Sequence, residues 1–367
     1  MNQAKSMNVC NQVGRNEMRR HHPVTVLLLI VLTASRLLAA EARIVVKKNR
    51  ADEPLAKTFS AQKSIDFIER SVSRWQAEQK CITCHTNGLH LVAGSAATPQ
   101  SEVLLKNREF SRNYLSSYVQ HNKKPKGDHG ALYGIVAGAS FLAISEMTTA
   151  KELHPDTAAA LDYIWTRQSQ SGAWDSWLKC HWGPYEVDDH FGASLAAIAL
   201  AMTPDAYRKK PESIRAWQNL KKYFKANPPV SAHQKGMLLW LSRYAPESLT
   251  SVEKKKWLKE LRDLQQADGG WVLIHLGNAD WQRRDKQPQA QISDGYATAF
   301  VVYALRQSGV SESDPAIKRG IAWLKAHQRE SGRWFTHSPR VDGKHYITQA
   351  ASNMALLALS SCGELVD

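Results

Sequence analysis

The feature that most constrains the fold is a pattern, Q-x-x-x-G-x-W, that recurs along the chain. Its three copies are Gln168–Trp174, Gln265–Trp271 and Gln328–Trp334. A helical pattern with a tryptophan on its apolar stripe precedes each copy; these residues are Trp165, Trp257 and Trp323. An Ala-rich segment follows each copy, at His190–Met202, Gly295–Leu305 and Tyr346–Leu359. Such recurrence is typical of architectures in which each unit buries its apolar face against the next.

Each repeat predicts an outer helix, a glycine turn and an inner helix. The glycine ends the outer helix in a conformation that other residues resist. The tryptophan should fold back over apolar surface between helices, and the glutamine should bond peptide groups left unpaired at the helix end. The remaining apolar periodicity predicts helices near 61–77, 101–120, 131–148, 211–226 and 231–245, with no alternating strand pattern. We therefore expect an all-α fold of about six helical hairpins closed into a ring.

The repeated pattern resembles the QW motif of squalene–hopene and oxidosqualene cyclases. The third copy extends the similarity, because Arg319, Gly320, Trp323 and Leu324 precede it at the spacing of that motif. The resemblance covers residues 60–362 and implies the (α/α)6 toroid of the terpenoid cyclase and protein prenyltransferase families.

The first 42 residues have the pattern of an export leader. Three basic residues, Arg15, Arg19 and Arg20, precede an apolar run from Val24 to Ala40, and Ala40–Ala42 forms a small-residue cleavage site. The run is short for a membrane span, which needs roughly 20 residues, although an uncleaved signal anchor is the alternative. No later segment is expected to cross a bilayer. We therefore expect an exported, periplasmic protein.

The remaining chain is expected to contain two regions. Residues 43–130 should form N-terminal helices that are part of the toroid or packed on it, and residues 131–367 the toroid itself. The formal net charge of the whole chain is +14, and its basic residues are spread along predicted helices. An exported protein is not expected to meet nucleic acid. Anionic head groups, through peripheral contact at most, or an acidic redox protein would suit this charge.

An acidic motif precedes the first Ala-rich segment. Glu186, Asp188 and Asp189 form E-x-D-D, which is similar to the D-x-D-D of class II terpene cyclases. In that family an aspartic acid protonates an alkene or epoxide, and crowded carboxylates resist joint ionisation. The resemblance implies that Asp188 is the proton donor, with Asp189 and Glu186 beside it, acting on an apolar isoprenoid-type ligand.

The same residues have a structural interpretation. Asp294 stands at the start of the next Ala-rich segment, where Asp189 stands in this one. Aspartate is favoured at the N-cap of a helix, so Asp189 and Asp294 are predicted to be caps. The motif also departs from the family, since Glu186 replaces its first aspartate. The chain has room for only one toroid, whereas a family cyclase has its cavity between two.

A second motif, Cys81-Ile82-Thr83-Cys84-His85, has the C-x-x-C-H pattern of c-type haem attachment. Two thiols at this spacing can add to the two haem vinyl groups, and the adjacent histidine can bind the iron. Haem is attached outside the cytoplasm, so the predicted export leader supports the interpretation of this motif as a haem site. The site follows the first predicted helix and is interpreted as an altered repeat turn.

Other chemistries remain open at this motif. Cys81 and Cys84 could form a disulfide, or bind zinc with His85 and a further ligand such as His90. His90, His121, His129 and Met147 are the nearest candidates for a sixth iron ligand. Cys180 and His181 lie in an aromatic loop before the acidic motif, where they pack the loop or contact a ligand.

Three hypotheses follow. The first is a periplasmic protein that carries haem c at Cys81, Cys84 and His85, with a redox or sensing function, a redox partner protein and an apolar ligand in its cavity. The second is a cyclase-like isomerase that acts on a polyprene through Asp188. The third is a protein-binding scaffold in which the two cysteines form a disulfide.

Overall fold

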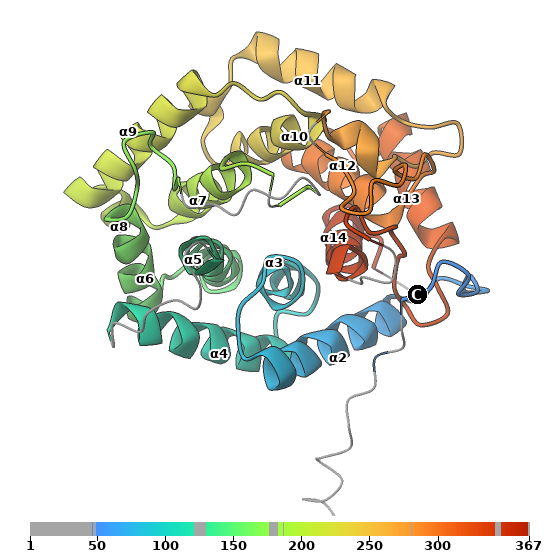
Figure 1. Cartoon of the computed structure of the whole chain (residues 1–367), viewed down its shortest axis with the longest axis horizontal. Helices are drawn as coiled ribbons and strands as arrows, with labels where there is room; N and C mark the ends of the chain where they lie inside the picture. Colours follow the sequence, from blue (N-terminus) through green and yellow to red (C-terminus); the bar gives the residue numbers. More distant parts are fainter. Residues whose placement is uncertain are drawn as a thin grey trace, which may run out of the picture. The chain divides into compact units, whose positions relative to one another are not determined.

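Helices alternate between an outer and an inner ring (Figure 1). The computed structural model describes residues 46, 49–120, 130–175, 183–185, 187–279, 281–341 and 346–365, all in the unit Val45–Asp367. The outer helices are α2 (Ala61–Gln79), α4 (Glu102–Val119), α6 (Pro155–Trp165), α9 (Pro211–Ala226), α11 (Ser251–Asp263) and α13 (Pro315–Ala326). The inner helices are α3 (Asn87–Ala97), α5 (Gly130–Thr149), α7 (His190–Met202), α10 (Ala232–Leu241), α12 (Gly295–Gln307) and α14 (Tyr346–Ser361). Short helices α8 (Asp205–Arg208), η1 (Pro246–Ser248) and η2 (Leu273–Leu276) lie in the connections.

The predicted all-α toroid of six hairpins is confirmed within the described residues. Each inner helix packs against the next one around the ring, and α14 packs against α3, so the inner ring is closed (Figure 1). Small side chains permit this approach; in α7, for example, all residues except the last are buried. The buried apolar residues form one continuous cluster that runs from α2 to α14.

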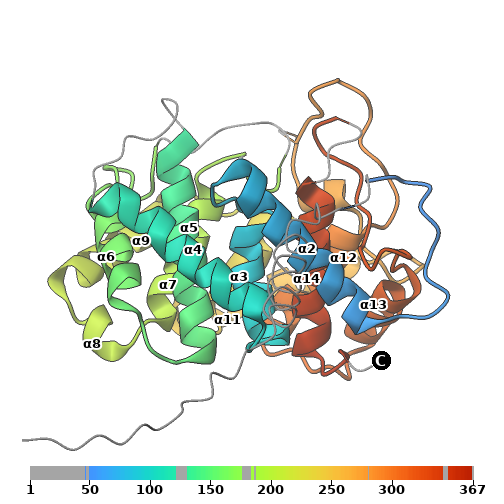
Figure 2. The same cartoon turned by 90° about the horizontal axis from the view of Figure 1, so that it is seen from below.

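The inner helices all run in one direction, because each follows an outer helix across a hairpin. Their N-terminal ends therefore gather at one end of the ring, which we call the mouth. The loops before α12 and α14, orange and red in Figure 2, extend together at one end of the ring.

The three QW turns have the same internal bonds. The indole nitrogens of Trp174, Trp271 and Trp334 donate to the carbonyls of Ile164, Leu261 and Leu324 at 3.0, 2.7 and 2.7 Å. Each of these carbonyls lies in the last turn of an outer helix, where the regular i to i+4 bonds end. The glutamine of each turn donates to the carbonyl of its own glycine, at 3.0, 2.8 and 3.3 Å. The tryptophans are buried as predicted, but they, and not the glutamines, bond the carbonyls at the helix ends, while each glutamine bonds the glycine carbonyl of its turn.

The glycines of these turns have φ values of +94°, +90° and +91° at Gly172, Gly269 and Gly332. A side chain at Gly332 would also meet the Lys63 carbonyl oxygen of α2 at 2.1 Å. Glycine is therefore required both by the backbone conformation and by the next outer helix.

The last turn closes the ring onto the first hairpin. Gln328 accepts from the Ser60 amide and donates to the Ser60 carbonyl, both at 2.8 Å. Beside this pair, Glu53, which is half-buried, accepts from the guanidinium of Arg333, which is buried. We call these contacts the seam.

The first hairpin was incompletely predicted. The helix α3 was missed, because it is buried on nearly every side and shows no amphipathic stripe. Residues 43–130 contribute α2, α3 and α4 to the same ring as the rest of the chain. By length and composition α5 could cross a membrane over Leu132–Thr149, unlike the expectation for later segments, but 72% of that window is buried as part of the inner ring.

Candidate functional site

The C-x-x-C-H segment forms the turn between α2 and α3, at the mouth. The Cys81 carbonyl accepts from the Trp75 indole at 3.2 Å and from the Asn87 side-chain amide at 3.0 Å. The Asn87 oxygen accepts from the Thr83 amide at 3.0 Å. Side chains on both helices thus hold the backbone of the turn.

This turn is a modified QW turn. Gln76 donates to Asn107 of α4 at 2.6 Å, as Gln168 of the first QW turn pairs with an asparagine of its next outer helix, α9. Lys80 stands four residues after Gln76, in the place of the glycine, with φ +52°. Ile82 stands in the place of the tryptophan and is buried. The interpretation of the motif as an altered repeat turn therefore agrees with its geometry.

The two thiols have different surroundings. Cys84 is buried within the apolar core, whereas Cys81 is half-buried, and no disulfide joins the two. Cys84 lies near Tyr185, whose pKa is raised well above its ordinary value by burial, by Tyr296 and then by Cys84. Cys81 contributes in the same way to the raised pKa of Tyr114, after burial and the hydrogen bond to a neighbouring tyrosine. The turn is thus accessible on one side and faces the core on the other.

His85 is held between aromatic rings. Its ring meets Trp75 edge-on at a centroid distance of 5.1 Å and Tyr346 of α14 at 5.4 Å. Its Nδ1 lies 2.8 Å from the hydroxyl oxygen of Thr86, and that hydroxyl donates to the Gln349 side-chain oxygen. The first and last hairpins together therefore fix this imidazole.

The candidate sixth ligands do not converge on this turn. His90 is fully buried and pairs with Asn107 of α4 at 3.2 Å; burial, and secondarily Arg108, lowers its pKa to about 4. Met147 lies near the C-terminal end of α5, opposite the mouth. His121 and His129 lie outside the described residues, as do Cys180 and His181. Among the described side chains, no group of three His, Cys, Asp or Glu is placed to hold a metal ion.

The acidic motif serves the start of α7. Asp188 accepts from the His190 amide at 2.8 Å with one oxygen and from Gln234 of α10 at 2.7 Å with the other. Asp189 occupies the N-cap position, but its side chain makes no capping hydrogen bond. The prediction that Asp189 caps α7 is therefore corrected, since Asp188 reaches the helix amide. Glu186 lies outside the described residues.

Asp294 is the cap that the sequence predicts for α12. One oxygen accepts from the amides of Tyr296 and Ala297 at 3.0 Å and from the Thr336 hydroxyl at 3.0 Å. The other accepts from the Leu273 amide at 2.6 Å. Burial raises its pKa to about 6, although these hydrogen bonds act in the opposite direction. It is thus a buried carboxylate that joins three segments at the mouth.

The mouth also contains an aromatic cluster that sequence reasoning missed. His233 of α10 lies 2.9 Å from the Tyr296 hydroxyl and stacks on Phe300 at 4.3 Å. Burial, and secondarily His190, lowers the pKa of His233 to about 3, so the ring is neutral. A cavity of about 10 Å³ beside Asp188 and His233 has room for one water molecule. The signal available in the sequence was an aromatic or histidine residue within the first two positions of α7, α10 and α12.

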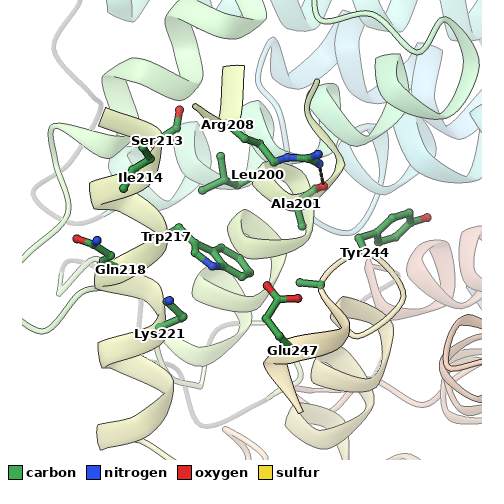
Figure 3. A pocket seen from close by; sticks show the side chains of 11 residues that line it. Leu200, Ala201, Arg208, Ser213, Ile214, Trp217, Gln218, Lys221, Tyr244 and Glu247 are labelled. Carbon is green, nitrogen blue, oxygen red and sulfur yellow. Dashed lines mark hydrogen bonds between the residues drawn. The ribbon is translucent and has the colours of Figure 1, made fainter. Parts of the chain in front are cut away.

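A groove of about 370 Å³ lies away from both motifs, at the opposite end of the ring. Trp217 reaches into its middle from α9, with Lys221 one turn further along the helix (Figure 3). Glu247 faces them from the turn after α10 (Figure 3). Within the described residues, the C-x-x-C-H turn and Asp188 therefore lie at the mouth, and this groove lies at the opposite end of the ring.

The fold and its QW turns define an α/α toroid of the squalene cyclase type. Within that class, residues 244–365 match the family model of the squalene-hopene cyclase C-terminal domain. This segment contains two of the QW turns and Asp294, whereas Cys81, His85 and Asp188 precede it.

Two solved structures were found to be similar to this chain to different degrees. A polysaccharide lyase is similar with a TM-score of 0.50 and 14% identity, over 82% of this chain and 96% of that chain. An ent-copalyl diphosphate synthase from Streptomyces platensis has a TM-score of 0.29 and 12% identity, over 76% of this chain and 50% of that chain. No curated protein matches the sequence.

Proposed function

We propose that this chain is an exported haem-binding protein with a redox or sensing function. Cys81 and Cys84 would hold haem c through thioether bonds, and His85 would bind its iron. When bound, the haem supplies a one-electron couple. The toroid would hold this site, and a redox partner protein and an apolar isoprenoid-type ligand would bind to it.

The observation that carries this proposal is the exchange of residues within the modified QW turn between α2 and α3. Three turns keep the glycine that φ requires and the tryptophan that covers the helix end. The modified turn has Lys80 and Ile82 instead, although Lys80 must adopt φ +52°. Stability alone favours glycine at such a position. The two thiols and the histidine gained there are therefore best explained by chemistry at the mouth.

The surroundings of the turn support the same function. Cys84 packs in the apolar core, and two aromatic rings flank His85. An apolar macrocycle would find apolar partners there. The leader over residues 1–42 would bring the chain to the compartment in which haem is attached.

The test is a visible spectrum and a pyridine haemochrome assay of protein expressed with its own leader in a host that attaches haem. We expect a c-type band that survives denaturation and is lost in Cys81→Ala/Cys84→Ala. The matched control is Cys362→Ala, which removes the remaining described cysteine, at the end of α14, and should keep the band. A protein without covalent haem, whose two thiols titrate as a disulfide or retain zinc, would refute the proposal and favour the scaffold.

A second candidate is a cyclase-like isomerase, favoured by the match of residues 244–365 to a cyclase domain. Its prediction is that the wild-type protein converts squalene and that Asp188→Asn abolishes the product, while Asp189→Asn does not. Product analysis by mass spectrometry tests it. Absence of product from the wild type, or equal product from Asp188→Asn, would contradict it.

A further inference from the structure

We infer that Thr86 and Gln349 are positioning residues that set the tautomer of His85. They place the ring hydrogen on Nδ1 and leave the lone pair on Nε2, the nitrogen that would bind the iron. The haem part of this inference rests on the proposed function, but the tautomer itself does not.

The direction of the hydrogen bonds carries the argument. The Thr86 hydroxyl donates its single hydrogen to the Gln349 side-chain oxygen. Its oxygen can therefore only accept at the 2.8 Å contact with His85 Nδ1, so Nδ1 carries the hydrogen. A neutral imidazole has one N–H, and Nε2 is then the basic nitrogen.

Burial makes this relay effective. Thr86 is 0% exposed and Gln349 is 6% exposed, so water does not compete for the hydroxyl or the amide oxygen. The rings of Trp75 and Tyr346 limit rotation of the imidazole. An acceptor behind a metal-binding histidine fixes its orientation and raises its basicity.

The relay also links the site to closure of the ring. His85 and Thr86 precede α3, while Gln349 lies 263 positions after Thr86, on α14. These are the inner helices of the first and last hairpins. The hydrogen bonds that fix the orientation and tautomer of His85 are therefore complete only when the toroid is closed.

The first experiment needs no haem. The full chain, labelled with ¹⁵N-histidine and made in a host without haem-attachment machinery, is examined at a pH where His85 is neutral. We expect His85 to be an Nδ1–H tautomer, with Thr86→Val shifting it toward Nε2–H and Thr86→Ser restoring it. An Nε2–H tautomer in the wild type, or no change in Thr86→Val, would overturn the inference.

The second experiment uses the haem-loaded protein. Gln349→Leu removes the acceptor and should raise the midpoint potential, because a less basic imidazole stabilises ferric iron less. Gln349→Glu is a stronger acceptor and should lower it. Opposite shifts in two variants of one residue are not expected from damage to the fold.

The two failures are distinguishable. Absence of haem from the wild type refutes the proposed function, and the tautomer experiment still decides the relay. Haem that is present but has the same potential in both Gln349 variants overturns the role of the relay alone.

Discussion

Alanine substitutions at four glycines separate the cost of backbone strain from the cost of a steric clash. Gly172, Gly269, Gly332 and Gly309 have φ values of +94°, +90°, +91° and +91°. A Cβ atom would meet a backbone oxygen of the next outer helix at 2.1 Å in Gly172 and Gly332, and at 2.9 Å in Gly269. At Gly309 it would meet nothing within 4 Å. Gly309→Ala is therefore a matched control with strain but no clash.

The magnitudes follow from this geometry. Left-handed backbone costs an alanine about 1–2 kcal/mol, and all four variants share this term. A contact at 2.1 Å with a carbonyl oxygen cannot be relieved by a side chain, so α2 or α9 must move away. Overpacking of this kind adds about 1–3 kcal/mol. We expect Gly172→Ala and Gly332→Ala to lose about 2–5 kcal/mol, Gly269→Ala less, and Gly309→Ala about 1–2 kcal/mol.

Guanidinium unfolding measures the free energy of unfolding of each variant. Tryptophan fluorescence and far-UV circular dichroism must give coincident transitions for the comparison to hold. The expected order of loss is Gly332 and Gly172 first, then Gly269, then Gly309. If Gly332→Ala were no more destabilising than Gly309→Ala, the packing of the QW glycine against the next helix would be unimportant, and the reasoning would be wrong.

Three further predictions concern the carboxylates. Burial opposes ionisation of Glu53, but the hydrogen bonds that it accepts across the seam hold its pKa below the ordinary 4.5. The stability that the ionised Glu53 contributes to the fold is therefore present above pH 4.5 and is lost as the pH falls below it. Wild type should therefore lose more stability than Glu53→Gln in acid unfolding, and equal losses would refute this. Burial raises the pKa of Asp294 to about 6, so its contribution is present below its ordinary 3.8 and is lost as pH rises through about 6. Asp294→Asn should flatten that part of the pH–stability profile, and an unchanged slope would contradict it. Asp188→Ala should lower the free energy of unfolding by about 0.5–2 kcal/mol through loss of the α7 cap, and Asp189→Ala should lower it by less. Thermal unfolding compares the two variants. If Asp189→Ala were the more destabilising, Asp189 would be the cap.

The repeated turns were predictable because their chemistry is local. Glutamine, glycine and tryptophan act within one turn and on the adjacent helix end, so their spacing alone predicted helix ends and hairpins. Asp294 was predictable for the same reason, since an N-cap bonds amides two and three residues ahead. The sequence predicted Asp189 as the cap of α7, but Asp188 is the residue that accepts from the helix amide. Two aspartates stand side by side here, and only the backbone conformation decides which of them reaches the amide.

The first hairpin was harder to predict. Its turn lacks the glycine and the tryptophan of a QW motif, and its equivalence became visible only through Gln76 and the positive φ of Lys80. The inner helix α3 was missed because a helix buried on nearly all sides leaves no periodic pattern.

By itself, the sequence determined the helical hairpin, three of its repeats and the presence of two thiols and a histidine at a spacing suited to haem. These depend on residues close together in the chain. The tertiary structure alone decided that Gln349 lies behind Thr86 and that Asp188 joins α7 to α10. Such contacts form between segments that approach only when the ring closes, and no spacing along the chain records which distant side chains will meet.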